Sequence, residues 1–325
     1  MRVLVTGAGG FLGRYVVAGL LQRGHDVRAI IRPTSCDPQW SDAVELFRAD
    51  LRVHDNLVPA FDGIDAVIHL AAATRGGEDA QFTSSVVGTE RFLNAMTQSS
   101  VRRLIHVSSL VVYDWTRAVG VMDENTPLLT NASDMGAYTI AKVWQERVVK
   151  SCAKAQAWDL TIVRPGFIWG PKHSEIGGMG RHYGRVYLMF GPLTRLPLCY
   201  VENCASCIIA AVENPAAIGE TFNAIDSDDI RVWRYVREFA RRTGRHGLML
   251  PLPYYCGLGL AHSASLISRI LFGKKGKLPS LLMPLRFEWQ FKPIRFSTRK
   301  LREKLGWRPP LSFHESLKRT YETTV

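Results

Sequence analysis

A glycine-rich turn near the N-terminus constrains the fold of this chain more than any other feature. In "RVLVTGAGGFLGRYVVAGLLQRG", a short apolar run over 2–7 is followed by three glycines and by a helical pattern over 11–23. The G-x-x-G-x-x-G spacing provides a tight turn, close approach of the backbone to a ligand, and a helix N-terminus directed at negative charge. A simple strand-to-helix turn needs only one glycine. The sequence therefore predicts a turn that binds the pyrophosphate of a dinucleotide, with contacts at Gly7, Gly10, Phe11, Leu12 and Gly13.

Short apolar runs alternate with helical patterns through the first half of the chain. Expected strands cover 2–7, 26–31, 43–50, 65–72, 103–109 and 160–165, and expected helices lie near 11–23, 79–99 and 136–156. Near-continuous apolar strands that alternate with helices are typical of a parallel sheet covered on both faces. We therefore predict an α/β chain with a Rossmann-type, doubly wound parallel sheet and a small C-terminal substrate cap.

The second half is less regular. A helix near 202–213, a short strand over 220–225 and a helix near 230–243 are expected to return to the core, whereas 171–200 is rich in Gly, Pro and aromatic residues. The predicted domains are a dinucleotide-binding core over 1–170, joined by 201–243, and a substrate-binding cap that makes up most of 171–325. The cap is expected over the carboxyl ends of the strands, where open α/β sheets bind ligands.

The residues at the ends of the second, third and fourth expected strands indicate which cofactor binds and where it makes contact. A carboxylate after the second strand would accept a hydrogen bond from the ribose of NAD, but "AIIRPTS" has Arg32 followed by Thr34 and Ser35. This predicts a preference for NADP, with NAD as the alternative, since Arg32 could instead stack on the adenine. Contacts with the adenine and the nicotinamide ribose are expected from Asp50, Leu51, Leu70, Ala71 and Ala72, although each could also be plain strand-end packing.

Tyr138 and Lys142 lie four residues apart in "GAYTIAKVWQ", so they share one face of the helix expected there. Together with the glycine-rich turn and "VSSLVVY" (107–113), this pair makes the chain resemble the extended short-chain dehydrogenases/reductases. The resemblance continues through "VRPGFIWGP" (163–171), "LPLCYVENCASCIIAAV" (196–212), "GETFNA" (219–224) and "LREKLGWRPPLSFHESL" (301–317). It therefore extends over nearly the whole chain.

The resemblance implies roles for several residues. Tyr138 is expected to act as general acid/base, and Lys142 to hold the nicotinamide ribose and to favour the phenolate, whose parent phenol has a pKa near 10. Ser109 is expected to position the substrate carbonyl, with Ser108 as the alternative. The resemblance also implies cofactor contacts at Pro165 and Ile168.

Residues at other positions indicate which reaction of this family is expected. Leu110 and Val111 stand where dehydratases of this family carry an acidic pair, which argues against dehydration. The Asn and Arg that hold a sugar diphosphate in many relatives are absent from "RPGFIWGP" and "LPLCYVEN", although Arg195 is close, and Ser85 replaces a usual Asn. We expect NAD(P)-dependent hydride transfer to or from a secondary alcohol or ketone of a moderately apolar substrate. A nucleotide-sugar 4-epimerase and a non-catalytic NADP-sensing module are the alternatives.

The net charge of +12 raises the question of an anionic partner. No nucleic-acid-binding motif occurs, so nucleic acid is not expected. In the segment 258–277, apolar residues recur at helical spacing before a lysine cluster, so this segment could lie on an anionic membrane surface or cover an apolar pocket. A homodimer through the helices near 79–99 and 136–156 is a further expectation.

The cysteines and the N-terminal segment indicate whether a metal site and a signal peptide are expected. Cys204 and Cys207 have a C-x-x-C spacing, but no second pair of Cys or His residues matches it, which favours buried thiols over a zinc or redox site. No metal ligand set is predicted. The chain opens directly on the first strand without the pattern of a signal peptide, and we expect a cytoplasmic enzyme.

Overall fold

The computed structural model describes residues 1–322 apart from 36–39, 41, 54–55, 74–76, 134, 227–228, 245–246, 273–278 and 280–281. Its main feature is a seven-stranded sheet in the order β12-β7-β5-β4-β1-β2-β3, in which every paired strand is parallel. The strands are β1 (Arg2–Thr6), β2 (Asp26–Ile31), β3 (Val44–Arg48), β4 (Ala66–His69), β5 (Arg103–Val107), β7 (Asp159–Pro165) and β12 (Thr221–Ala224). The predicted Rossmann-type doubly wound sheet is confirmed.

The strand order reverses beside β1. From β1 the chain proceeds outward through β2 and β3, then returns to place β4 on the other side of β1. Such a reversal leaves a crevice at the carboxyl ends of the strands, because the connections on its two sides run in opposite directions. The glycine-rich turn follows β1 and therefore lies at this crevice.

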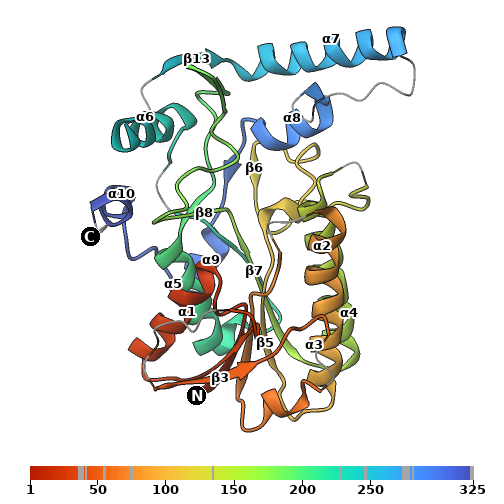
Figure 1. Cartoon of the computed structure of the whole chain (residues 1–325), viewed down its shortest axis with the longest axis vertical. Coiled ribbons are helices and arrows are strands. Elements are labelled where there is room, and N and C mark those ends of the chain that lie inside the picture. Colours follow the sequence, from red (N-terminus) through yellow and green to blue (C-terminus); the bar gives the residue numbers. More distant parts are fainter. Residues whose placement is uncertain are drawn as a thin grey trace.

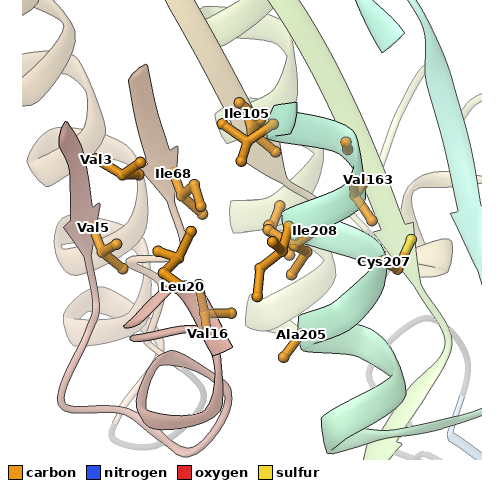
Figure 2. Close-up of a cluster of buried hydrophobic side chains, with 14 of the residues drawn as sticks. Val3, Val5, Val16, Leu20, Ile68, Ile105, Val163, Ala205, Cys207 and Ile208 are labelled. Carbon is orange, nitrogen blue, oxygen red and sulfur yellow. The ribbon is translucent and has the colours of Figure 1, made fainter. Parts of the chain in front are cut away.

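Helices cover both faces of the sheet (Figure 1). One face carries α1 (Phe11–Gln22) and α5 (Val201–Glu213), and the other carries α2 (Glu78–Phe82), α3 (Gly88–Thr97) and α4 (Ala137–Ala155). Figure 2 shows Val16 and Leu20 of α1 and Ile208 of α5 gathered over strand residues such as Val5 and Ile105. Cys199, Cys204 and Cys207 are free thiols buried in this same apolar cluster.

The helix predicted near 79–99 differs from the expectation. It is divided into α2, a π-helical turn η2 (Thr83–Val87), and α3, which ends at Thr97. The Thr89 hydroxyl donates to the Ser85 carbonyl at 2.6 Å, so a side chain satisfies an oxygen near the irregular turn. Single π turns inside helices are frequent at functional sites, and this one lies next to the crevice.

The remaining elements form small sheets and helices, many beyond the strand ends. The short strands are β6 (Val121–Met122), β8 (Phe167–Trp169), β9 (Arg181–Tyr183), β10 (Val186–Phe190), β11 (Leu198–Tyr200), β13 (Leu248–Leu252) and β14 (Arg295–Phe296). The helices are α6 (Val232–Thr243), α7 (Tyr254–Phe272), α8 (Pro284–Phe291), α9 (Arg299–Leu305) and α10 (Phe313–Glu322), with 3-10 turns η1 (Val58–Phe61), η3 (Leu110–Val112) and η4 (Pro215–Ala217). Leu301 of α9 and Trp307 pack in the cluster beneath α1 and α5. The division into core and cap stays a prediction.

Helix α7 projects from the body of the molecule (Figure 1). Tyr254 and Ala261 are buried, and a Cβ atom at Gly257 would lie 2.3 Å from Phe287 Cζ, so the N-terminal half of α7 packs closely on α8. Within the described part of the chain, no helix has the length and apolar character needed to cross a bilayer.

Candidate active site

A cavity of about 900 Å³ lies at the carboxyl ends of the parallel strands. Most of the residues that the sequence predicts for catalysis or cofactor binding line it, whereas Thr34 and the alternative serine, Ser108, do not. Those that line it are Gly7, Gly10, Phe11, Leu12, Gly13, Arg32, Asp50, Leu51, Leu70, Ala71, Ala72, Ser109, Tyr138, Lys142, Pro165 and Ile168. Residues from six strand ends thus meet at one crevice, as parallel strands require.

The glycine-rich turn is shaped for close approach. Gly7 has φ of +68°, and a Cβ atom there would lie 2.9 Å from the Ala71 nitrogen. A Cβ atom at Gly13 would lie 2.2 Å from the Gly7 carbonyl oxygen, so only glycine lets α1 pack this closely on the turn. Gly10 caps α1 without a side-chain hydrogen bond, and the first turn carries no acidic residue. The N-terminal amides of α1 can therefore bind the pyrophosphate of a dinucleotide.

Charged side chains surround the end of the cavity next to β2 and β3. Arg32 is exposed, and Ser35 lines the cavity beside it. The Arg52 guanidinium binds the Asp50 carboxylate, with Nη2–Oδ2 at 2.6 Å and Nε–Oδ1 at 2.9 Å. This pair lowers the pKa of Asp50 to about 2. Arg52 also lines the cavity, a position that the sequence did not single out.

Ser109 and Ser108 have different surroundings. Ser109 lines the cavity, and its hydroxyl accepts the Val111 amide at 3.4 Å at the start of η3. Ser108 is buried, and its hydroxyl donates to Glu146 Oε2 at 2.5 Å. Because its hydroxyl is already engaged behind the cavity wall, Ser108 is the weaker candidate for a substrate contact.

Tyr138 is half-buried in the cavity wall. Burial raises the pKa of its phenol above the usual 10, and a hydrogen bond with Ser109 acts in the opposite direction. The lowering expected from Lys142 is therefore not reached in the protein alone. The phenol is protonated at neutral pH.

The Lys142 ammonium is buried at the end of β5. Its Nζ donates to the Val107 carbonyl at 3.0 Å and to Gln145 Oε1 at 2.9 Å. Burial lowers the pKa of Lys142 to about 8, although the Glu146 carboxylate favours the charged form. Two of the three ammonium protons are thus held by fixed oxygens, and one remains for a ligand.

The rest of the cavity is mainly aromatic and aliphatic. Its wall includes Trp115, Met135 and Phe167, together with Arg286, Trp289 and Gln290 of α8. Trp115 and Trp289 lie against each other, with ring centroids 5.8 Å apart. These α8 residues lie in the predicted cap, but the sequence gives no sign of their place in the site, because α8 reaches the cavity only through tertiary packing.

The described side chains of α7 do not line the cavity. The alternative that the segment 258–277 covers an apolar pocket is therefore wrong for the described part of this segment. Residues 273–277 lie outside the part of the chain that the structure describes. The nearby helix that does reach the cavity is α8.

A family model matches most of the chain. The model described as the NAD dependent epimerase/dehydratase family matches residues 3–224. The chain belongs to this family. The resemblance to extended short-chain dehydrogenases/reductases is confirmed, and the chain is an enzyme of the NAD(P)-dependent type. Its cofactor is a nicotinamide dinucleotide, which fits the glycine turn and the uncapped N-terminus of α1.

Individual relatives extend over nearly the whole chain. A 3-beta-hydroxysteroid dehydrogenase from Mycolicibacterium neoaurum is 28% identical, with 97% of this chain and 89% of the relative aligned. A UDP-glucose 4-epimerase from Vibrio cholerae is 24% identical over 98% of this chain and 94% of the relative. The crystal structure of a UDP-glucuronic acid 4-epimerase from Bacillus cereus in complex with NAD is 19% identical, with a TM-score of 0.73 over 99% of this chain and 96% of that one. This structural likeness establishes the fold.

Proposed function

We propose that the protein transfers a hydride between NAD(P) and a secondary alcohol or ketone of a moderately apolar substrate. The observation that carries this proposal is the convergence of Ser109, Tyr138 and Lys142 on a cavity whose other walls include Trp115 and Trp289. A bound nicotinamide would supply or accept the hydride. The protein must then hold the carbonyl and exchange one proton with its oxygen.

Each of the three polar residues has a distinct part. The Ser109 hydroxyl holds the substrate oxygen, and the Tyr138 phenol gives a proton to that oxygen during reduction or takes one during oxidation. The raised pKa of Tyr138 keeps the phenol protonated and ready to donate. The free ammonium proton of Lys142 binds the cofactor ribose and brings positive charge to the same pocket, which favours the phenolate once the proton has left.

The apolar walls favour a substrate such as a fused-ring or isoprenoid ketone over a sugar nucleotide. The relative named as a 3-beta-hydroxysteroid dehydrogenase is consistent with this class. The relative named as a UDP-glucose 4-epimerase supports the alternative. An epimerase would show no net cofactor turnover. A third alternative, a module that senses NADP without catalysis, has no need of the Tyr138 phenol.

We propose that NADP is preferred over NAD. Arg32 follows β2 at the rim of the cavity, and Ser35 lies close to it, so a 2′-phosphate would meet a cation and a hydroxyl. The Asp50 carboxylate is bound directly by Arg52, and the charge of Arg32 contributes least to the lowered pKa of Asp50.

We infer that α7 lies on an anionic membrane surface. Six large apolar side chains on this helix are each 55–77% exposed, namely Tyr255, Leu260, Leu266, Ile267, Ile270 and Leu271. At 100° per residue they fall within about 160° of the helix circumference, opposite the face that packs on α8. Arg269 and three lysines in the sequence over 273–278 follow, which suits acidic headgroups. An apolar substrate could then enter the cavity next to α8 directly from the lipid.

A homodimer is proposed through α2, α3 and α4. Trp144 of α4 is 47% exposed and Phe82 of α2 is 37% exposed, and the two helices pack side by side. A shared apolar surface of this kind can pair with a second copy about a two-fold axis.

The function is tested by a substrate screen and one substitution. Purified protein is mixed with NADPH and with steroid, isoprenoid-quinone and nucleotide-sugar compounds, and NADPH absorbance is followed. Tyr138→Phe should lower kcat by about 10²–10⁴-fold, the usual contribution of a general acid, while NADPH affinity stays nearly the same. Full activity in this variant would refute the proposal, and turnover of UDP-sugars without change in absorbance would establish the epimerase instead.

A further inference from the structure

Gln145 is a fully buried polar residue whose place in the site the sequence did not predict. It lies on α4, three residues after Lys142, and its Oε1 accepts the Lys142 ammonium at 2.9 Å. The only other oxygen bonded to that ammonium in the described part of the chain is the Val107 carbonyl. The oxygen of the Gln145 amide is thus bonded to the proposed cofactor-binding lysine.

The nitrogen of the Gln145 amide bonds to residues in and next to the cavity wall. Gln145 Nε2 lies 2.9 Å from the Ala71 carbonyl, 2.8 Å from Thr89 Oγ1 and 3.2 Å from the Ser85 carbonyl. Ala71 follows β4 and lines the cavity, and Ser85 lies in the π turn η2. One side chain therefore connects α4, the end of β4 and the irregular turn.

We propose that Gln145 is a positioning residue that fixes the Lys142 ammonium in the active site. The inference rests on the proposed function, since it assigns Gln145 to the lysine that holds the cofactor. The Ser85 hydroxyl accepts the Ala73 amide at 3.0 Å, and among the described residues no hydrogen bond joins it to Lys142. The Gln145 carboxamide reaches the lysine from α4 instead.

The chemistry of a carboxamide suits this position. Its oxygen stabilises a buried ammonium without adding charge, and its nitrogen donates to the Ala71 carbonyl at the end of β4. The ionisable groups around Lys142 are Tyr138 and Glu146 on α4, His69 on β4 and His106 on β5. Both histidines are buried and have strongly lowered pKa values, so they stay neutral and leave Glu146 as the nearby charge.

Two nearly isosteric substitutions test the proposal. Gln145→Met removes the oxygen that accepts the ammonium, and Gln145→Glu keeps an oxygen there and adds a negative charge. Both variants lose the donor to the Ala71 carbonyl, so only the charge beside Lys142 differs in sign of effect between them. We would titrate NADPH by fluorescence from pH 6 to pH 9.5, which follows Lys142 without requiring a substrate. Gln145→Met should weaken NADPH binding by about 10- to 100-fold, as expected for a lost bond to a charged group. The pH at which binding declines should fall by about one unit in Gln145→Met and rise in Gln145→Glu.

Asn203→Leu is the matched control. Asn203 is also a fully buried carboxamide, but it binds Asp226 and Leu311, and none of these three residues lines the cavity. The Asn203→Leu substitution should lower the melting temperature without changing the pH dependence of NADPH binding. Unchanged pH dependence in the Gln145→Glu variant would overturn the proposal, and that variant retains the shape of the wild-type side chain if Gln145→Met does not fold.

The same preparations separate this inference from the proposed function. Tyr138→Phe should bind NADPH with the wild-type pH dependence and lack turnover. If Tyr138→Phe is active, the assignment of the general acid fails while the titration still reports on Gln145 and Lys142. If Tyr138→Phe is inactive and the Gln145→Glu titration matches wild type, only the inference fails.

Discussion

At the scale of single residues, two neighbouring serines at the end of β5 have different contacts and different predicted roles. Ser109 faces the cavity, whereas the Ser108 hydroxyl is held by Glu146. The "VSS" motif alone left both open, because two consecutive residues after a strand differ only in the direction of their side chains. The local backbone decides between them.

This difference predicts opposite phenotypes. Ser109→Ala should reduce kcat by about 10- to 100-fold, since a bond to the developing charge on the carbonyl oxygen is lost, with little change in melting temperature. Ser108→Ala should instead lower the free energy of unfolding by about 1–3 kcal/mol, because a buried carboxylate loses a donor. Steady-state kinetics and urea unfolding of both variants measure these effects, and the reverse pattern would reassign the substrate contact to Ser108.

Arg32 gives a second prediction at this scale. Arg32→Ala should raise the Kd of NADPH by about 10- to 100-fold, because a bond between a guanidinium and a 2′-phosphate is lost. The Kd of NADH serves as the internal control, since NADH lacks this phosphate and should bind almost unchanged. Equal losses for both cofactors would indicate that Arg32 stacks on the adenine instead.

At the scale of elements, a buried ion pair joins α4 to β7. Arg164 Nε lies 3.0 Å from Glu146 Oε2, Lys150 Nζ lies 2.6 Å from Glu146 Oε1, and Arg164 Nη1 also donates to Tyr113. Burial opposes ionisation of Glu146, but Arg164 and Lys150 outweigh it and lower the pKa of Glu146 to about 2. This network anchors the helix that carries both Tyr138 and Lys142.

The lowered pKa makes stability depend on pH. Glu146 contributes stability above its unfolded pKa of about 4.5, and that contribution is lost as the pH falls toward about 2. Glu146→Gln should therefore lower the free energy of unfolding by ~3 kcal/mol at pH 7 and by less at pH 3. Urea unfolding at both pH values tests this, with Glu90→Gln on the exposed face of α3 as the control. An equal loss at the two pH values would contradict the assigned pKa.

The elements of the core were predictable, and those of the cap were not. Strands such as β2 and β5 are mainly apolar and lie between turn residues, so their positions could be read locally. In contrast, β10 pairs with β13 and β14 pairs with β6, partners that are far apart in the chain. Such short strands contain too few residues to show an alternation of apolar and polar side chains in the sequence. Trp289 was missed as a site residue for the same reason, because only the packing of α8 brings it to the cavity.

At the scale of the whole molecule, the exposed face of α7 and the cavity lie on neighbouring elements. The close contact between Gly257 and Phe287 joins α7 to α8, whose residues Arg286 and Trp289 reach the cavity. A surface-bound α7 would therefore bring the substrate end of the enzyme close to the lipid.

The membrane contact predicts sedimentation with vesicles. Wild-type protein should cosediment with phosphatidylserine-containing vesicles at low salt and less so at high salt, since headgroup attraction is screened. The double variant Leu266→Glu/Ile270→Glu should lose binding, because two charges replace apolar residues on the exposed face. Val119→Glu, at an 87% exposed position elsewhere, should bind normally. Failure of the wild type to sediment at low salt would rule out the contact.

The π turn at Thr83–Val87 has a consequence for how this enzyme can vary. A π turn holds one residue more than an α-helical turn and spreads a similar rotation over it, so α2 and α3 keep nearly the faces they would have in one continuous helix. Deleting one residue from the turn should leave Phe92 and Met96 buried, but it would remove the spacing by which the Ser85 hydroxyl accepts the Ala73 amide and the Ser85 carbonyl accepts the Thr89 hydroxyl. A shortened turn should thus disturb the cavity wall at Ala73 rather than the packing of α3.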